Sequence, residues 1–334
     1  MKKYLIFYFF ITNVWFICGQ NMRTIAIEAV DARPLNLSEI AEHVTPIVLE
    51  KSVTLQNIFL TSEYLFGASI SSVIQFDSSG KFIRSIDCGG YVTSNVTADT
   101  INKELYVPVG EKMKCYDFSG NFKREFSLIA SSIYCLYHKG FLWVQCQQFL
   151  PDARFIFFLY KINPTTSETT TFPFDVKYEP LRDENGNVTG AMGANGCLSI
   201  YNDEVVVSLN RERALYTIQQ GKCAPLIQWD ISPPLNAKEP SGLYIHGFIG
   251  KYLIIEYPIN TKSSTFLENV ETGDKYNINQ LVDDVFNTNG HCYIRLMAQK
   301  GYFYFSKERR EIKENSIGNI PPNSGQVIFI VKTK

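Results

Sequence analysis

The sequence has no large excess of positive or negative charge. Its 334 residues contain 32 lysines and arginines against 33 aspartates and glutamates, which leaves a net charge of −1. Electrostatic binding of a nucleic acid or of an anionic membrane requires a strongly basic surface. The composition therefore predicts no nucleic-acid partner.

Local catalytic and metal-binding motifs are also missing. The sequence has no G-x-S-x-G and no Walker loop, and no two histidines share an H-x-H, H-x-x-x-H or H-E-x-x-H spacing. The four histidines are His43, His138, His246 and His291. These absences exclude a site built within one short segment, but not a site assembled from separate strands.

Cysteine pairs with the spacing of a zinc or redox site are absent as well. Seven cysteines follow residue 20, and none of them lies in a C-x-x-C. Such cysteines act mainly as small apolar residues within strands. A disulfide between Cys135 and Cys146 stays open if the protein folds in an oxidising compartment.

Helical periodicity is nearly absent. Residues 37–42 and 279–286 carry short patches of it, which predict single turns or loops. β-Branched and aromatic residues dominate elsewhere, as on a half-buried pleated surface. With 45% hydrophobic and 14% aromatic residues, the chain has enough apolar side chains for one large core. The sequence predicts an all-β protein.

The first twenty residues have the pattern of a signal peptide. Two lysines precede an apolar stretch at residues 4–17, and a plausible cleavage zone follows at residues 19–20. Lipid modification of Cys18, with anchoring at the outer membrane, is the alternative. No later segment is long and apolar enough to span a bilayer. We therefore expect a signal peptide at residues 1–20 and a single exported domain at residues 21–334, in the periplasm or outside the cell.

The clearest positive feature is a repeat with a period of 40 residues. The segment VIQFDSSGKFIRSI at residues 73–86 returns as MKCYDFSGNFKREF at residues 113–126. The matched positions include an aspartate, a glycine and a phenylalanine. A fixed period near 40 is typical of propeller blades or solenoids.

The matched residues in this repeat predict a tight turn. Aspartate can bond to its own backbone in an Asx-turn, and glycine adopts positive φ without steric cost. We therefore interpret Asp77 and Asp117 as turn-forming residues rather than catalytic ones. Phe82 and Phe122, which open the second strand of each hairpin, are predicted to pack between adjacent sheets.

Weaker copies of the unit predict six repeats. Each is expected to begin with a strand near the ring axis, in the segments 63–67, 104–107, 138–144, 202–209, 250–257 and 300–306. Closing such an array into a ring limits its exposed edges. Residues 45–51 have the pattern of a spare strand, which we expect to complete the sheet begun by residues 300–332. The predicted fold is an all-β, six-bladed β-propeller whose ring is closed by an N-terminal strand.

The two copies of the repeat resemble the NHL-like six-bladed β-propeller proteins exported by Bacteroidetes. The lead-in LNLSEIAEHVTPIVLEKS at residues 35–52 and the segment ETGDKYNINQLVDDVF at residues 271–286 resemble the same family. A glycine-rich GxGPGEY stretch, which follows the first hairpin in many relatives, is reduced here to CGGY at residues 88–91. The resemblance implies the propeller fold and export, and it leaves the ligand unassigned.

Irregular segments mark the candidate binding region, because long loops on rigid β scaffolds often carry binding residues. The longest departure from the repeat is residues 173–201. Within it, residues 183–187 partly match a calcium loop, but the position of the glycine favours a type I′ turn at Asn185–Gly186. The candidate binding residues in or near such segments are Trp143, Arg154, Tyr178, Arg182, Arg211, Arg213, Tyr244 and His246.

These observations favour an exported binding module without a cofactor. Its partner would be a glycan, a peptide or a protein of the cell envelope. The alternative is a hydrolase or lyase with a central-channel site assembled from several blades, to which calcium could contribute. Two or more Asp, Glu or Asn side chains that converge at one channel mouth would favour the enzyme.

Overall fold

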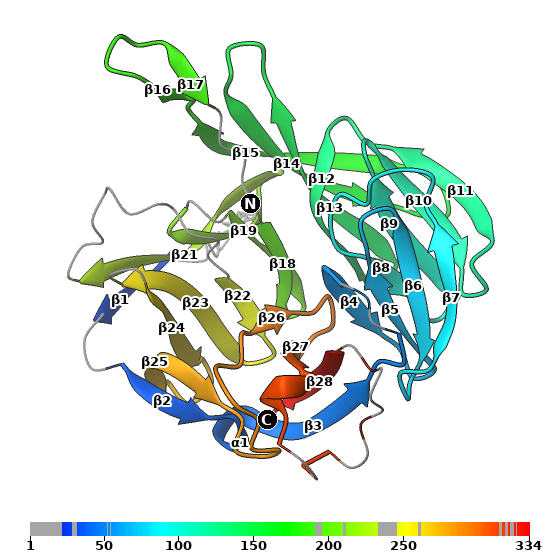
Figure 1. Cartoon of the computed structure of the whole chain (residues 1–334). Coiled ribbons are helices and arrows are strands. Elements are labelled where there is room, and N and C mark those ends of the chain that lie inside the picture. The colour runs from blue at the N-terminus through cyan, green and yellow to red at the C-terminus, as the bar shows by residue number, and fades with distance from the viewer. Residues whose placement is uncertain are drawn as a thin grey trace, which may run out of the picture.

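The computed structural model describes residues 22–28, 32–51, 53, 55–190, 196–209, 212–232, 246–259, 262–313, 316–317, 320, 324 and 326–334. The predicted signal peptide and Cys18 lie outside these residues. The described chain is almost entirely β-structure arranged around a common centre (Figure 1), with one helical turn, α1 (Leu37–Ile40), and one short 3-10 turn. The all-β prediction is confirmed. In this part of the chain, no helix is long and apolar enough to cross a membrane.

Consecutive strands pair antiparallel in runs of four. The first run contains β4 (Asn57–Leu60), β5 (Tyr64–Ala68), β6 (Ser72–Asp77) and β7 (Phe82–Asp87). The second contains β8 (Thr97–Asp99), β9 (Glu104–Val109), β10 (Lys112–Asp117) and β11 (Phe122–Ser127). In both runs the order in the sheet follows the order in the chain, as short hairpin connections require.

Two further runs share a nine-stranded sheet. One contains β12 (Ser131–His138), β13 (Phe141–Phe149), β14 (Phe155–Ile162) and β15 (Thr169–Tyr178). The other contains β18 (Gly196–Tyr201), β19 (Glu204–Leu209), β20 (Ala214–Gln219) and β21 (Lys222–Ser232). One parallel pair, Phe174 on β15 and Cys223 on β21, joins them. The short hairpin of β16 (Leu181–Arg182) and β17 (Val188–Gly190) lies between these runs in the sequence.

The last two runs complete the sequence of sheets. One contains β22 (His246–Ile249), β23 (Tyr252–Ile259), β24 (Lys262–Asn269) and β25 (Lys275–Val282). The other contains β26 (Arg295–Leu296), β27 (Tyr302–Glu308), β28 (Gln326–Thr333) and β3 (Ala41–Val48). The final strand of the second sheet therefore comes from the N-terminal part of the chain.

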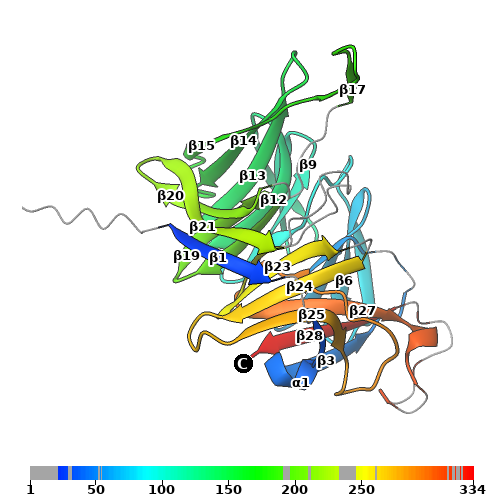
Figure 2. The ribbon, with the colours of Figure 1, turned by 90° about the vertical axis from the view of Figure 1, so that its left-hand side faces the viewer.

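The N-terminal segment adds an outer strand to three different sheets. β1 (Arg23–Glu28) pairs in parallel with β21, and β2 (Arg33–Asn36) pairs in parallel with β25. β3 pairs antiparallel with β28, and Figure 2 shows β1 beside β21 and β3 beside β28. The predicted pairing of residues 45–51 with the sheet of residues 300–332 is thus observed as far as Val48.

The 40-residue repeat forms two matching hairpins, β6–β7 and β10–β11. In each, the aspartate (Asp77 or Asp117) accepts hydrogen bonds from the backbone N–H groups two and four residues later. The glycines Gly80 and Gly120 have φ angles of 93° and 85°. The interpretation of both aspartates as turn-forming residues is confirmed.

Two predictions about the repeats are wrong in detail. Phe122 does not pack between sheets but is 55% exposed. Phe82, at the same position in the other hairpin, is partly buried against the core, as predicted, and the Lys51 ammonium lies over its ring. The segments expected nearest the axis are instead the second strands of the runs, since a first strand precedes each of them. First strands of neighbouring runs contact one another, as β12 and β18 or β18 and β22 do.

The core lies between facing sheets. One apolar cluster joins the first sheet to the sheet of β3 and β28 and contains Leu65, Phe76, Ile47 and Ile328, each at most 3% exposed. A second cluster joins the β8–β11 and β12–β15 sheets and includes Cys135 and Cys146. All seven cysteines of the described residues are buried and free, so the Cys135–Cys146 disulfide that the sequence left open is not formed.

Candidate functional site

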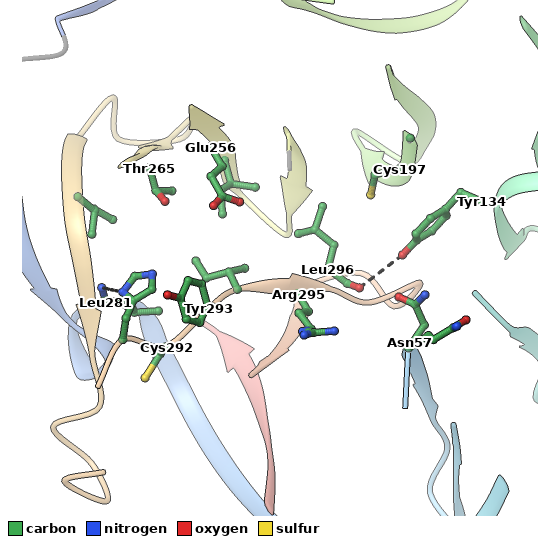
Figure 3. Close-up of a pocket in the computed structure, with 16 residues that line it drawn as sticks. Asn57, Tyr134, Cys197, Glu256, Thr265, Leu281, Cys292, Tyr293, Arg295 and Leu296 are labelled. Carbon is green, nitrogen blue, oxygen red and sulfur yellow. Dashed lines mark hydrogen bonds between the residues drawn. The ribbon is translucent and has the colours of Figure 1, made fainter. Parts of the chain in front are cut away.

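A cavity of about 410 Å³ lies near the centre of the arrangement of sheets. The first strands β4, β12, β18 and β26 form part of its wall, and the β23–β25 face and the chain before β26 form the rest (Figure 3). Its polar lining residues are Gln56, Asn57, Tyr134, Glu256, Thr265, His291, Tyr293 and Arg295. The volume and the mixture of apolar walls with a few polar groups are typical of small-ligand sites. We call it the central cavity.

The central cavity exists because the last run has a very short first strand. β26 has two residues, and the chain at residues 283–294 forms bends rather than a strand. Asp283, 1% exposed, holds these bends together, because its carboxylate accepts hydrogen bonds from the backbone N–H groups of Val285 and Phe286 and from the Thr288 hydroxyl. The cavity wall is therefore a fixed loop in the place of a strand.

A buried lysine fixes the other end of this loop. Lys307 on β27 is 1% exposed, and its ammonium donates hydrogen bonds to the carbonyl oxygens of Asn289 at 2.7 Å and His291 at 2.9 Å. A carboxylate oxygen of Glu311 lies 3.7 Å from the same nitrogen. Since buried charges persist only when they are paired or hydrogen-bonded, these contacts explain why Lys307 is tolerated there.

The histidine of the central cavity is neutral at pH 7. Nδ1 of His291 accepts a hydrogen bond from the backbone N–H of Leu281 at 3.0 Å, so the ring proton lies on Nε2. Burial, together with the positive charge of Lys307, lowers the pKa of His291. The ring of Tyr293 stands perpendicular to it at 4.5 Å. The pair presents an aromatic edge and hydrogen-bonding groups to the cavity.

One carboxylate and one guanidinium line the central cavity from different walls. Figure 3 shows Glu256 on the wall formed by β23 and Arg295 on the wall formed by β26. Thr265 lies beside Glu256, and Arg295 also interacts with the hydroxyl group of the buried Tyr304. This arrangement can recognise a ligand that carries hydrogen-bond donors at one end and acceptors at the other.

The thiols of the central cavity are not activated as nucleophiles. Burial raises the pKa values of the Cys197 and Cys292 thiols to about 12, so both are protonated at neutral pH and are poor nucleophiles. Glu256 is its one carboxylate among the described residues, and Asn57 lies on another wall (Figure 3). Within the described ranges, no three His, Cys, Asp or Glu side chains gather as metal ligands would. The expectation of no cofactor, and the possibility of calcium in the alternative enzyme, both stay predictions.

The structure places the candidate residues of the sequence at separate locations. Trp143 lies between the β12–β15 and β18–β21 sheets, away from the central cavity. Arg154 pairs with Asp152 at the tip of the β13–β14 hairpin. Tyr178 is 5% exposed and packs its ring edge-on against Phe157 at 4.8 Å.

The remaining candidates are also dispersed. The Arg182 guanidinium donates to the carbonyl oxygen of Gly186 within its own hairpin, and Arg213 is exposed. Arg211 and Tyr244 lie outside the described residues. The turn at residues 183–187 is not type I′, because Gly186 has a positive φ of 81° and Asn185 does not. It is instead the same aspartate-centred turn as in the repeat, with Asp183 as the acceptor.

Sequence reasoning missed Glu256, Thr265 and Arg295. These residues lie within or next to strands of ordinary composition, on segments of the chain that are tens of residues apart. Pairing of β23 with β24 and the position of the loop before β26 bring them to one cavity. Within the sequence, the short irregular stretch before residue 295 could have pointed toward this wall.

His246 is a buried residue at the start of β22. It is 1% exposed, and its Nε2–H donates to the carbonyl oxygen of Leu209 at 3.1 Å. The ring stands edge-on against Trp229 at 5.0 Å. Burial lowers the pKa of His246 to about 4. The imidazole therefore links two neighbouring sheets in its neutral form.

Lowering the pH from 7 to 5 is expected to reduce the free energy of unfolding by about 2 kcal/mol through His246. The unfolded chain binds a proton here near pH 6.5, whereas the folded chain does so only near pH 4. This contribution is therefore complete above pH 6.5 and is lost as the pH falls toward 4. Urea unfolding at pH 7, 6 and 5 measures it. His246→Gln should lose this part of the pH dependence and the exposed His43→Gln should keep it; equal slopes for wild type and His246→Gln would contradict the assignment.

Solved structures similar to this chain are β-propeller-like. A candidate exported protein of Bacteroides fragilis matches with a TM-score of 0.65 and 13% identity, over 93% of this chain and 99% of that chain. The WD40 domain of Neurospora crassa Pan2 matches with a TM-score of 0.45 and 10% identity, over 84% and 76% of the two chains. BamB from Moraxella catarrhalis matches with a TM-score of 0.42 and 10% identity, over 86% and 98%.

At these identities the similarity concerns the fold alone. No protein-family model matches the sequence. No curated protein matches it either. The function of this chain must therefore be argued from its own residues.

Proposed function

We propose that this protein is an exported six-bladed β-propeller that binds a small polar ligand in its central cavity. Support for the blade number comes from the six antiparallel runs, β4–β7, β8–β11, β12–β15, β18–β21, β22–β25 and β26–β28 with β3. Each run begins with a strand toward the common centre and ends at the periphery. The repeat at residues 73–86 and 113–126 is the part of the chain that supports NHL-like membership.

Closure of the ring by the N-terminal strand is part of the proposal. β3 completes the last run through its pairing with β28. The same sheet packs on the first run through the apolar cluster of Ile47, Leu65, Phe76 and Ile328. Because the two ends of the chain share one sheet, unfolding of the first or last run exposes the core of the other.

The observation that carries the binding function is the lining of the central cavity. Glu256 and Arg295 supply opposite charges, and His291 and Tyr293 supply an aromatic edge. The described lining residues include neither a second carboxylate nor an activated thiol, and this composition supports recognition over turnover. A ligand with both donor and acceptor groups, such as a short peptide or a glycan fragment, fits this chemistry.

Export and envelope partners complete the proposal. The pattern of residues 1–20 supports export to the periplasm or the cell exterior, with lipidation of Cys18 as the alternative. The ligand fragment in the cavity would then belong to a glycan, a peptide or a protein of the cell envelope. The alternative function is hydrolase or lyase activity, which would appear as conversion of a screened compound into product.

A thermal-shift screen of dipeptides and disaccharides tests the binding function. A ligand at one hundred times its Kd is expected to stabilise the protein by about 2.7 kcal/mol, which is visible as a raised Tm. Arg295→Gln is expected to weaken binding of the best compound roughly tenfold, because a charge-assisted hydrogen bond is lost. Titration calorimetry measures that ratio.

Arg154→Gln is the matched control for this experiment. Arg154 is paired with Asp152 on a hairpin tip away from the central cavity, so its substitution should leave the affinity unchanged. A loss of affinity in Arg154→Gln with none in Arg295→Gln would move the site to the hairpin tip. If the wild-type protein converts the compound into product, the function is catalysis rather than binding.

A further inference from the structure

We propose that a second site, in a cavity between the β12–β15 and β18–β21 sheets, binds a sugar ring that carries a carboxylate. This cavity has a volume of about 360 Å³ and shares no lining residue with the central cavity. Its walls come from β13, β14, β15, the end of β12 and the turn after it on one side, and from β19, β20 and the turn before β19 on the other. The inference is independent of the function proposed for the central cavity.

The strand register builds an aromatic wall on one side of this second cavity. Trp143 on β13 lies directly opposite Lys161 on β14, and Phe172 on β15 follows on the same face. The rings of Trp143 and Phe172 are stacked, with centroids 6.3 Å apart and an interplanar angle of 23°. All three residues are half-buried, so the wall belongs to the cavity rather than to the core. The negative face of an aromatic ring attracts the weakly positive C–H face of a sugar.

A lysine without a carboxylate partner lies over this wall. The Lys161 ammonium is 3.9 Å from the centroid of the Phe141 ring and 5.4 Å from that of Trp143. Among the described residues it forms no ion pair with an acidic side chain. A carboxylate on the ligand would give this cation a charge-assisted partner, which is stronger than the contact with the rings alone.

The opposite wall carries acceptors that suit hydroxyl groups. Asp203 lies in the turn between β18 and β19, Glu204 is the first residue of β19, and both residues line the cavity. The Lys139 ammonium lies 2.6 Å from a carboxylate oxygen of Asp203, and this ion pair orients the Asp203 side chain. Carboxylates accept hydrogen bonds from hydroxyl groups and repel other carboxylates, so the hydroxyl groups of the sugar would face this wall and its carboxylate would face Lys161. Acceptors on one wall and a cation on the other therefore favour an acidic sugar over an aromatic acid or a neutral sugar.

The indole of Trp143 provides a further indication of a ligand. Its Nε1–H is buried and, within the described part of the chain, has no hydrogen-bond acceptor. A buried donor without an acceptor destabilises the folded protein, and an acceptor supplied by a ligand removes that cost. A ligand oxygen in the adjacent cavity, reached by a small rotation of the half-buried ring, would supply the missing acceptor.

Binding of glucuronic acid and its oligomers to the purified protein tests the proposal. In protein prepared without residues 1–20 the tryptophans are Trp143 and Trp229, and Trp229 is 4% exposed, so quenching of tryptophan fluorescence by the added sugar reports mainly on Trp143. Titration calorimetry should show binding of the acidic oligomer and at least tenfold weaker binding of the matched glucose oligomer. Lys161→Met is expected to weaken binding of the acidic oligomer roughly tenfold and to leave the glucose oligomer unchanged. Trp143→Ala is expected to abolish binding of both.

Lys51→Met is the matched control. The Lys51 ammonium also lies over a phenylalanine, 4.4 Å from the Phe82 centroid, but in another sheet and outside this cavity. Its substitution should leave sugar binding unchanged, and a melting curve of each variant shows whether the fold is intact. The proposal is overturned if no acidic sugar binds, if the glucose oligomer binds as tightly, or if Lys161→Met binds like the wild type. None of these outcomes affects the central cavity, which the Arg295→Gln experiment tests separately.

Discussion

Deleting residues 22–48 is expected to abolish cooperative folding of the whole protein. The segment contains seven large aliphatic side chains that are at most 8% exposed: Ile25, Ile27, Leu35, Leu37, Ile40, Val44 and Ile47. At about 2 kcal/mol for each buried side chain, their loss removes on the order of 14 kcal/mol. Since a whole domain is stable by only about 5–15 kcal/mol, the remaining chain should not fold.

The deletion also breaks three sheets at once. β1, β2 and β3 pair with β21, β25 and β28, so each of the last three runs loses its outermost strand. The loss of β3 also uncovers the apolar cluster between the first and last runs. Circular dichroism and calorimetry of the truncated protein measure the effect, as loss of the cooperative transition.

A shorter deletion separates ring closure from simple loss of apolar contacts. Removing residues 22–28 takes away Ile25, Ile27 and the ion pair of Arg23 with the buried Glu268 at 2.5 Å, but it leaves β3 in place. This variant is expected to fold, with a free energy of unfolding lower by about 4 kcal/mol. A 22–48 deletion that melts cooperatively at the wild-type temperature would exclude ring closure by β3.

Lys307→Met is expected to lower the free energy of unfolding by about 3 kcal/mol. The ammonium group donates hydrogen bonds to the carbonyl oxygens of Asn289 and His291. Methionine has no donor, so both carbonyl oxygens would lose this hydrogen bond. The loop that forms one wall of the central cavity would then lose an anchor. Urea denaturation at pH 7 gives the free-energy difference directly.

A second measurement distinguishes this local role of Lys307 from general loss of stability. The positive charge of Lys307 contributes to the lowered pKa of His291, so Lys307→Met should raise that pKa. An NMR titration of the His291 imidazole shows the shift. The control is Lys332→Met, which removes an exposed lysine paired with Glu42 at 2.8 Å and should change stability little. If Lys332→Met were as destabilising as Lys307→Met, the anchoring role would be wrong.

Local features of the sequence predicted the local structure well. Asp77 with Gly80, and Asp117 with Gly120, fix two turns by side-chain bonds to the adjacent backbone, so they can be read without tertiary information. The sequence also predicted a spare strand at residues 45–51. This apolar segment has the pattern of a β-strand but lies before the first hairpin, so it has no neighbouring strand in the sequence to pair with. Its actual partner, β28, was predicted from the need of the last sheet for a further strand.

Predictions about side chains far apart in the sequence were less successful. Arg154, Arg182 and Arg213 were selected because they lie near irregular segments, but hairpin tips turn such residues outward or onto their own loop. His246 was selected for its position after a loop, yet the packing of β22 against β19 buries it. Trp143 was selected as a stacking surface, and the structure adds the Lys161 ammonium that gives this surface a chemical preference.

The all-β class, the hairpin turns and the availability of residues 45–51 as an outer strand follow from the amino-acid sequence alone. These features depend on backbone preferences and on residues within a few positions of one another. Only the tertiary structure decided which residues share a cavity. Glu256 and Arg295 line one cavity because the run ending at β25 is followed by a loop anchored by Asp283 and Lys307 and then by a two-residue strand. That meeting depends on how separate sheets pack around a common centre, and no spacing within the sequence records it.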